Sequence, residues 1–171
     1  MSAGINSAGR NPTHLELVSF RLGEQIYGVP VSAVQEVVPE QDLTRIPKSH
    51  RSLAGLLNLR GQIVTAIDLR SCLDVGPGGA SQSRMNIVVL DRGEHFSLVV
   101  DSVGDVLSVD TDRIEPPPGT LHAKIRNVCG GVCRLEEGLV LIVNIPSVLE
   151  LGSSEPRRSE SKIANHKGEI A

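Results

Sequence analysis

The sequence predicts a mainly β protein made of two similar small barrels with a few short helices. About 40% of its 171 residues are hydrophobic, and Val, Leu and Ile fall in short runs separated by Gly and Pro turns. The same order of runs occurs twice, in repeat units of about 15–75 and 85–150. About five short strands per unit favour barrels, because closing a sheet on itself protects its edges from pairing with other chains.

An internal repeat supports this division. Residues 17–38 (LVSFRLGEQIYGVPVSAVQEVV) align with 87–107 (IVVLDRGEHFSLVVDSVGDVL), and residues 63–73 (IVTAIDLRSCL) align with 139–149 (LVLIVNIPSVL). Both matches keep the same order along the chain, so duplication explains them better than chance similarity between Val-rich strands. Two copies are too few for a solenoid and fit a pair of similar subdomains. The first match places Val34, Glu36 and Val37 on Val103, Asp105 and Val106.

The first unit begins with a hairpin and a short helix. Leu15–Leu22 and Gln25–Val31 are expected to pair across a Gly-Glu turn. Residues 31–38 have Val at helical spacing, but Val is a poor helix former, so we predict only a short helix there. Thr44–Pro47 is expected to be extended, because its proline keeps the preceding residue out of the α region.

A second hairpin completes the unit. Gly55–Leu59 and Gln62–Leu69 are expected to be its strands, and Gly61 in the turn adopts a positive φ at little cost. Residues 68–73 are expected to form a helical turn. The Gly-Pro-Gly-Gly-Ala-Ser stretch at 76–81 is expected to be a linker, because it lacks the Lys of a phosphate-binding loop.

The two ends of the chain are predicted to be tails around one folded domain over 15–150. Residues 1–14 and 151–171 hold too little apolar surface to offset the entropy of ordering, so both are expected to be disordered. The N-terminus does not resemble a signal peptide, and no apolar stretch approaches about 18 residues. We therefore expect a cytoplasmic protein without direct membrane insertion.

Composition and motifs argue against nucleic-acid binding and catalysis. The net charge is −3 and the pI is about 5.9, whereas a nucleic-acid footprint needs a basic stripe. Only Phe20, Tyr27 and Phe96 are aromatic, so a barrel that binds oligonucleotides would have few stacking platforms. The sequence contains no phosphate-loop, zinc-protease or serine-hydrolase motif. We expect no enzyme activity, no catalytic residue and no cofactor.

Cys129 and Cys133, in a Cys-Gly-Gly-Val-Cys stretch, suggest a different function. In an extended strand their Cα atoms would lie about 13 Å apart, beyond the roughly 4.4–6.8 Å of a disulfide, unless the two glycines form a bulge. Cys72 is a third thiol, but no fourth metal ligand is evident and the five histidines are scattered. Structural thiols are the preferred interpretation. A small barrel that senses redox state or metal through Cys129 and Cys133 is the alternative function.

Gly55–Leu69, with the sequence GLLNLRGQIVTAIDL, resembles the G-x-x-N-L-R-G-x-[IV]-x-P-x-[IV]-D-L signature of CheW-like domains. The resemblance covers about 15–150. Thr65 stands where the family commonly has Pro, which affects local strand geometry. Other segments that resemble the family, in the same order, are 27–28, 34–37, 44–47, 99–107 and 141–145.

The resemblance implies two intertwined five-stranded SH3-like barrels, related by pseudo-twofold symmetry, with a groove between them. It also implies a non-catalytic adaptor that couples chemoreceptors, the methyl-accepting chemotaxis proteins, to a CheA-type histidine kinase. The implied partners are the regulatory domain of the kinase and the cytoplasmic tip of chemoreceptors, with other CheW-like domains in array rings as a further candidate. The chain has no room for a kinase or receiver domain, so we expect a stand-alone adaptor held at membrane-associated receptor arrays by its partners.

Arg60 is the first candidate for a partner contact. Taken alone, an Arg at a hairpin tip is usually solvated, although its planar fork of five donors suits a partner's carboxylate or carbonyl groups. The resemblance assigns receptor contacts to Arg60, Val34 and Glu36, and less directly to Asn58, Val103 and Val106. The three valines fit a partner groove and the core equally well.

Overall fold

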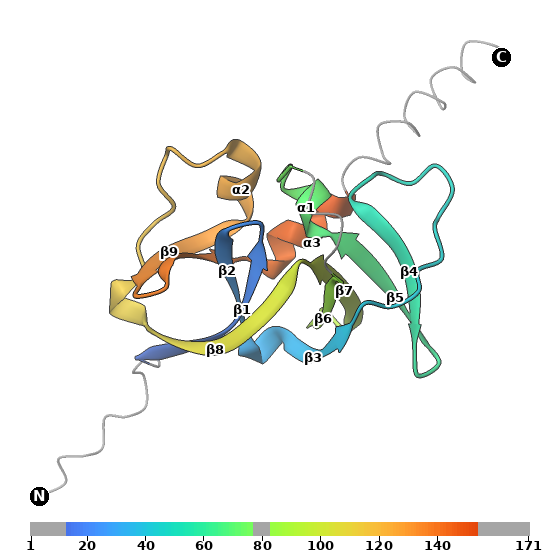
Figure 1. Ribbon diagram of the computed structural model, residues 1–171, viewed down its shortest axis with the longest axis horizontal. Coiled ribbons are helices and arrows are strands. Elements are labelled where there is room, and N and C mark those ends of the chain that lie inside the picture. Colours follow the sequence, from blue (N-terminus) through green and yellow to red (C-terminus); the bar gives the residue numbers. More distant parts are fainter. Residues whose placement is uncertain (1–12, 77–82, 154–171) are drawn as a thin grey trace, which may run out of the picture.

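The computed structural model describes residues 13–76 and 83–153, which form two five-stranded sheets (Figure 1). The first sheet has the order β8-β1-β2-β10-β9 and the second β3-β6-β7-β5-β4. The strands of the first sheet are β1 (His14–Leu22), β2 (Gln25–Pro30), β8 (Ser102–Asp110), β9 (Cys129–Leu135) and β10 (Gly138–Val143). Those of the second are β3 (Val34–Pro39), β4 (Leu53–Leu59), β5 (Gln62–Asp68), β6 (Met85–Asp91) and β7 (Glu94–Val100).

The strand orders reveal the duplication and show how its copies intertwine. Replacing β1–β5 by β6–β10, and the reverse, converts one order into the other. Each sheet therefore combines strands from both repeat units, so neither unit forms a sheet by itself. The expectation of a mainly β protein with two pseudo-symmetric five-stranded parts is confirmed.

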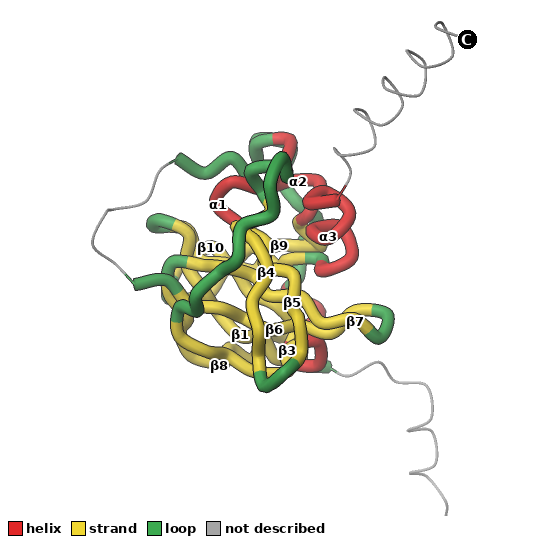
Figure 2. The backbone as a smooth tube through the Cα atoms, turned by 90° about the vertical axis from the view of Figure 1, so that its right-hand side faces the viewer, coloured by secondary structure: helices red, strands yellow, loops and turns green. Residues whose placement is uncertain are grey.

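The helices of the described residues are all short, and the three α-helices among them gather at one end of the molecule. The helices are η1 (Val31–Ala33), α1 (Leu69–Cys72), η2 (Thr111–Arg113), α2 (Ala123–Val128) and α3 (Ile145–Ser153). The three α-helices lie together on one side, and β3 and β8 lie on the opposite side (Figures 1 and 2). The edge strands β3 and β8 are thus set apart from the helical end.

One large core joins the two sheets. Phe20 and Tyr27 of the first sheet lie in the same buried cluster as Ile87 and Leu98 of the second, with ring centroids of the two aromatics 5.5 Å apart. Each sheet also has a smaller buried cluster of its own. The cluster of the first sheet includes Cys133, and that of the second consists of Leu57, Val64, Ala66 and Val99. Because burial of apolar surface is the main stabilising term, the two barrels are expected to unfold as one unit.

The predicted short helix over 31–38 is wrong for most of its length. A single 3-10 turn spans Val31–Ala33, and strand β3 follows. Along β3, half-buried residues alternate with exposed ones, which is the two-residue period of a strand. Pairing with β6 therefore determines the local structure. The extended conformation also agrees with the low helix propensity of Val.

The tip of the β4–β5 hairpin projects Arg60 away from the core. Arg60 and Gly61 both have positive φ, 52° and 84°, as a tight turn between twisted strands requires. The Asn58 side-chain oxygen accepts a hydrogen bond of 2.9 Å from the Gly61 backbone N–H, which holds the turn. The prediction that Gly61 supplies the turn is confirmed, and Arg60 shares its left-handed conformation.

Strand β1 begins at His14 and helix α3 ends at Ser153. The rest of the two expected tails, and nearly all of the expected linker at 76–81, lie outside the described residues. Within 13–76 and 83–153, no helix is long and apolar enough to cross a membrane.

Candidate partner-binding site

The centre of the site is an ion pair between Arg60 and Glu36. Their side chains meet at 2.7 Å, with 80% of the Arg60 side chain and 27% of the Glu36 side chain exposed. Glu36 lies on β3 and Arg60 directly follows β4, and these strands are the two edges of the second sheet. The ion pair therefore bridges the two edges of the sheet at the surface.

The open end of this barrel, which we call the mouth, lies beside the ion pair. It is a hollow of about 430 Å³ to which all five strands of the second sheet contribute. A bulge in β3, between Val34 and Glu36, changes the direction of side chains at its edge, as bulges do. The residues lining the mouth are Gln35, Glu36, Leu59, Arg60, Gln62, Val64, Val88 and His95.

The remaining predicted residues divide between the two sheets. Asn58 supports the turn that carries Arg60. Val34 on β3 and Val103 on β8 are half-buried and pack against the shared core, whereas Val106 on β8 is 58% exposed. The structure thus brings Arg60, Glu36 and Asn58 together, and places Val103 and Val106 on the pseudo-equivalent edge strand of the other sheet.

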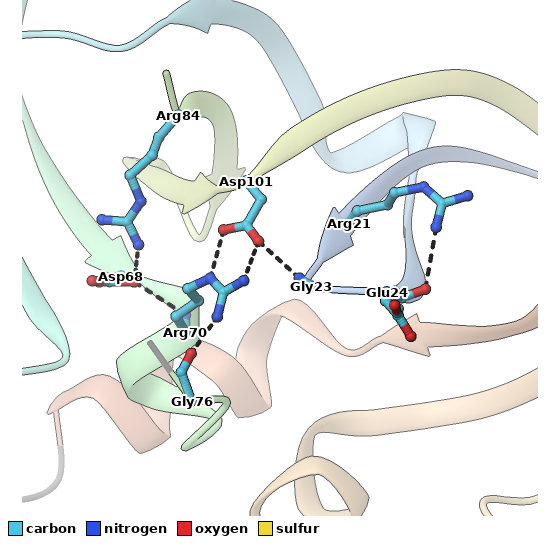
Figure 3. A network of polar contacts seen from close by, with 8 residues as sticks. All are labelled: Arg21, Gly23, Glu24, Asp68, Arg70, Gly76, Arg84 and Asp101. Carbon is cyan, nitrogen blue, oxygen red and sulfur yellow. Dashed lines mark hydrogen bonds and ion pairs between the residues drawn. The ribbon is translucent and has the colours of Figure 1, made fainter. Parts of the chain in front are cut away.

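A second polar cluster, which we call the clamp, connects the two sheets (Figure 3). Arg70 in α1 makes a bidentate pair with Asp101, whose second oxygen is also 2.7 Å from the Gly23 backbone N–H. Arg70 also donates to the Gly76 carbonyl. Only 12% of the Arg70 side chain and 15% of the Asp101 side chain are exposed, so the clamp is largely removed from solvent.

Asp68 extends the clamp into the second sheet. It caps α1 by accepting a hydrogen bond of 3.1 Å from the Arg70 backbone N–H, and it receives the Arg84 guanidinium at 2.8 Å. The clamp was not predicted from the sequence, although a signal for it was present. Asp68 is the last residue of β5, and Asp101 directly follows β7. These two strands are parallel neighbours, and Asp68 lies opposite Val99. Parallel neighbours end at the same edge of a sheet.

The clamp should make the stability of the protein vary with pH in the acidic range. The hydrogen bonds from Arg70 lower the pKa of Asp101 below its usual value. A depressed carboxyl pKa adds stability above the unfolded-state pKa of about 3.9 and loses it as the pH falls through the folded-state pKa. We expect the urea concentration at the unfolding midpoint to decrease as the pH is lowered below about 4. In the Asp101→Asn variant this midpoint should decrease less steeply over the same pH range. Equal pH dependence of the two proteins would contradict this role.

The cysteines have the environment of structural thiols. All three are free; Cys133 lies inside the first-sheet cluster, and the Cys129 thiol donates to the Gly131 carbonyl at 3.0 Å. Burial raises the pKa of Cys72 to about 11 and also raises that of Cys129. Among the residues described, no group of three His, Cys, Asp or Glu side chains could hold a metal ion.

These thiols should react slowly while the protein is folded. The thiolate is the reactive form, and the raised pKa of Cys72 and Cys129 disfavours it, whereas Cys133 is only 1% exposed to a reagent. Alkylation by iodoacetamide at pH 7.5 is expected to be much slower in buffer than in urea for all three cysteines, as measured by mass spectrometry. Fast labelling of Cys129 or Cys133 in the folded protein would instead favour the redox-sensing alternative.

Comparisons with known proteins agree with this architecture. A family model described as the CheW-like domain matches residues 16–152. The probable chemotaxis protein CheW of Rhizobium etli is 28% identical over 155 residues, covering 91% of this chain and 99% of that protein. The chemotaxis protein CheW of Klebsiella aerogenes is 34% identical over 136 residues, covering 78% and 81%.

A solved structure gives the same result. The crystal structure of the scaffolding protein TtCheW from Thermoanaerobacter tengcongensis has a TM-score of 0.68 to this chain and 32% sequence identity, covering 75% of this chain and 88% of that one. The expectations of an SH3-like two-barrel fold and of a chemotaxis scaffold with no enzymatic activity are confirmed by these relationships. The chain belongs to the family of CheW-like domains.

Proposed function

We propose that this chain is a cytoplasmic adaptor that couples chemoreceptors to a CheA-type histidine kinase. The observation that carries the proposal is the Arg60–Glu36 ion pair, held at an exposed hairpin tip on an edge of the second barrel. A solvated ion pair contributes little to stability, so folding alone gives a weak reason for this geometry. Charged groups presented in this way suit recognition of a partner.

The receptor side of the adaptor is the surface formed by the edge strands β3 and β8. Arg60, Glu36 and Asn58 provide its polar part, and Val34, Val103 and Val106 its apolar part. Such a combination accepts the apolar face of a helix between polar contacts. The partner is the helical hairpin at the cytoplasmic tip of a chemoreceptor.

The kinase docks elsewhere on the molecule, through its own related regulatory domain. Other CheW-like domains in array rings would use a similar barrel-to-barrel contact. The adaptor passes a signal by changing the relative placement of its two partners, and it performs no chemistry itself. Its cytoplasmic position at receptor arrays then follows from its partners.

A bridging experiment tests the proposal. A cytoplasmic receptor fragment from the organism that encodes this chain is immobilised, and the kinase is passed over it with and without this chain. We expect the kinase to be retained only when the chain is present, in a ternary complex seen by size-exclusion chromatography with light scattering. Binding of neither partner would contradict the proposed function, and binding of only one would limit it to that partner.

A further inference from the structure

We propose that the mouth of the second barrel receives one carboxamide side chain, Asn or Gln, from the receptor helix that docks beside it. The inference rests on the proposed function and adds Gln62 and His95 to the contact residues. Neither residue is singled out by the sequence pattern, and both line the mouth.

The size and lining of the mouth suit the polar end of one side chain. Its volume of about 430 Å³ falls in the range of ligand pockets. Its lining is mainly polar, and Val64 and Val88, which also line it, are only 1% exposed. A side chain that enters the mouth would therefore meet mostly polar groups.

The polar groups are already positioned before any partner arrives. Gln62 Nε2 and His95 Nδ1 lie 2.7 Å apart, and this contact links β5 to β7. When Gln62 donates, the neutral imidazole carries its proton on Nε2 and becomes a donor there. Arg60 uses one of its five N–H donors on Glu36, and its exposed guanidinium can donate to a further acceptor.

Charge decides which side chain fits. Arg60 and Glu36 compensate each other, so the mouth presents both a donor group and an ionised acceptor. A partner carboxylate would gain Arg60 but would be repelled by Glu36, and an ammonium group would meet the reverse. A carboxamide carries both an acceptor and donors, so its oxygen can face Arg60 or His95 while its nitrogen faces Glu36.

The other barrel provides an internal contrast. Asp105 is the repeat partner of Glu36, and the β9–β10 turn, Glu136–Glu137, takes the place of the β4–β5 turn, Arg60–Gly61. Asp105 and Glu137 line a hollow of about 270 Å³ on the first sheet. The duplicated position therefore has acidic residues where the second barrel has the Arg60–Glu36 pair. The cation that lines this hollow is Arg21, whose guanidinium donates to the Glu24 carbonyl at 3.1 Å.

The test combines adaptor and receptor variants in one binding assay, isothermal titration of a cytoplasmic receptor fragment. Gln62→Ala and His95→Ala should each weaken binding about fivefold, the effect of one neutral hydrogen bond. Glu94→Ala is the matched control, because neighbouring residues on a strand point to opposite faces. Its affinity should stay within twofold of the unaltered protein.

The receptor fragment is altered in parallel, with each Asn and Gln of its tip changed to the matching acid. At one position this change should weaken binding about tenfold or more. The loss of affinity should be smaller when the adaptor carries Glu36→Gln, which removes the repelling charge. Double-mutant cycles should couple that same position to His95. If Arg60→Ala abolishes binding but no receptor position couples to Gln62 or His95, the mouth is not a binding site and this inference is wrong. If the unaltered chain does not bind the fragment, the proposed function fails with it.

Discussion

Arg60→Ala should abolish or strongly weaken receptor binding while leaving the protein folded. The Arg60 side chain is 80% exposed and its partner is a surface carboxylate, so removing it should lower the free energy of unfolding by less than about 1 kcal/mol. Loss of one partner from a desolvated charged contact costs about 2–5 kcal/mol of binding free energy. Urea unfolding and titration of a receptor fragment measure the two effects on the same variant.

Kinase binding is the control for this variant, because the proposed kinase surface lies elsewhere. The charge-swapped pair Arg60→Glu with Glu36→Arg is a second control: it should keep the barrel edges linked yet still bind the receptor poorly. An Arg60→Ala protein that unfolds would make the residue structural. A folded variant with normal receptor affinity would remove Arg60 from the contact surface.

In contrast to Arg60→Ala, a substitution that breaks the clamp should cause a large loss of stability. Arg70 and Asp101 are largely buried, and removing one partner leaves the other charge without compensation. Fully buried pairs lose about 3–5 kcal/mol in this way, and we expect about 2–4 kcal/mol for Arg70→Ala, because both side chains keep some contact with solvent. The measurement is the free energy of unfolding from urea titration.

The exposed pair between Arg51 and Asp74 is a matched control for the clamp. Its side chains meet at 3.0 Å with 64% and 49% exposure, so Arg51→Ala should change stability by no more than about 0.5 kcal/mol. The double variant of Arg70 and Asp101 should lose less than the sum of the single variants, since both remove the same interaction. Equal small losses for Arg51→Ala and Arg70→Ala would contradict a stabilising clamp.

The repeat in the sequence predicted the order of elements but not which strands pair. Hydrophobic runs such as 17–22 and 87–90 indicate strands, because side chains alternate between faces with a fixed period. Pairing depends on the path of the chain between strands, and here β2 and β5 pair in parallel with β10 and β7 of the other repeat unit. Exchange of strands between the units was available only from the family resemblance.

The predicted site divides in a similar way. The tip position of Arg60 could be predicted because Gly61 marks a turn between two strands, and the structure confirms it. The pairing of Arg60 with Glu36, 24 residues earlier, could not, because it depends on closure of the second sheet. The place of His95 in the mouth could not be predicted for the same reason, since nothing local relates it to Gln62.

The most direct test of the adaptor role is receptor control of the kinase in a reconstituted system. Receptor-containing membranes and the kinase are mixed with or without this chain, and kinase autophosphorylation is followed before and after the receptor's attractant is added. The proposal predicts that attractant changes the phosphorylation rate only when the chain is present, and that Arg60→Ala removes this dependence. Attractant control of the kinase without the chain, or no control with it, would contradict the adaptor role.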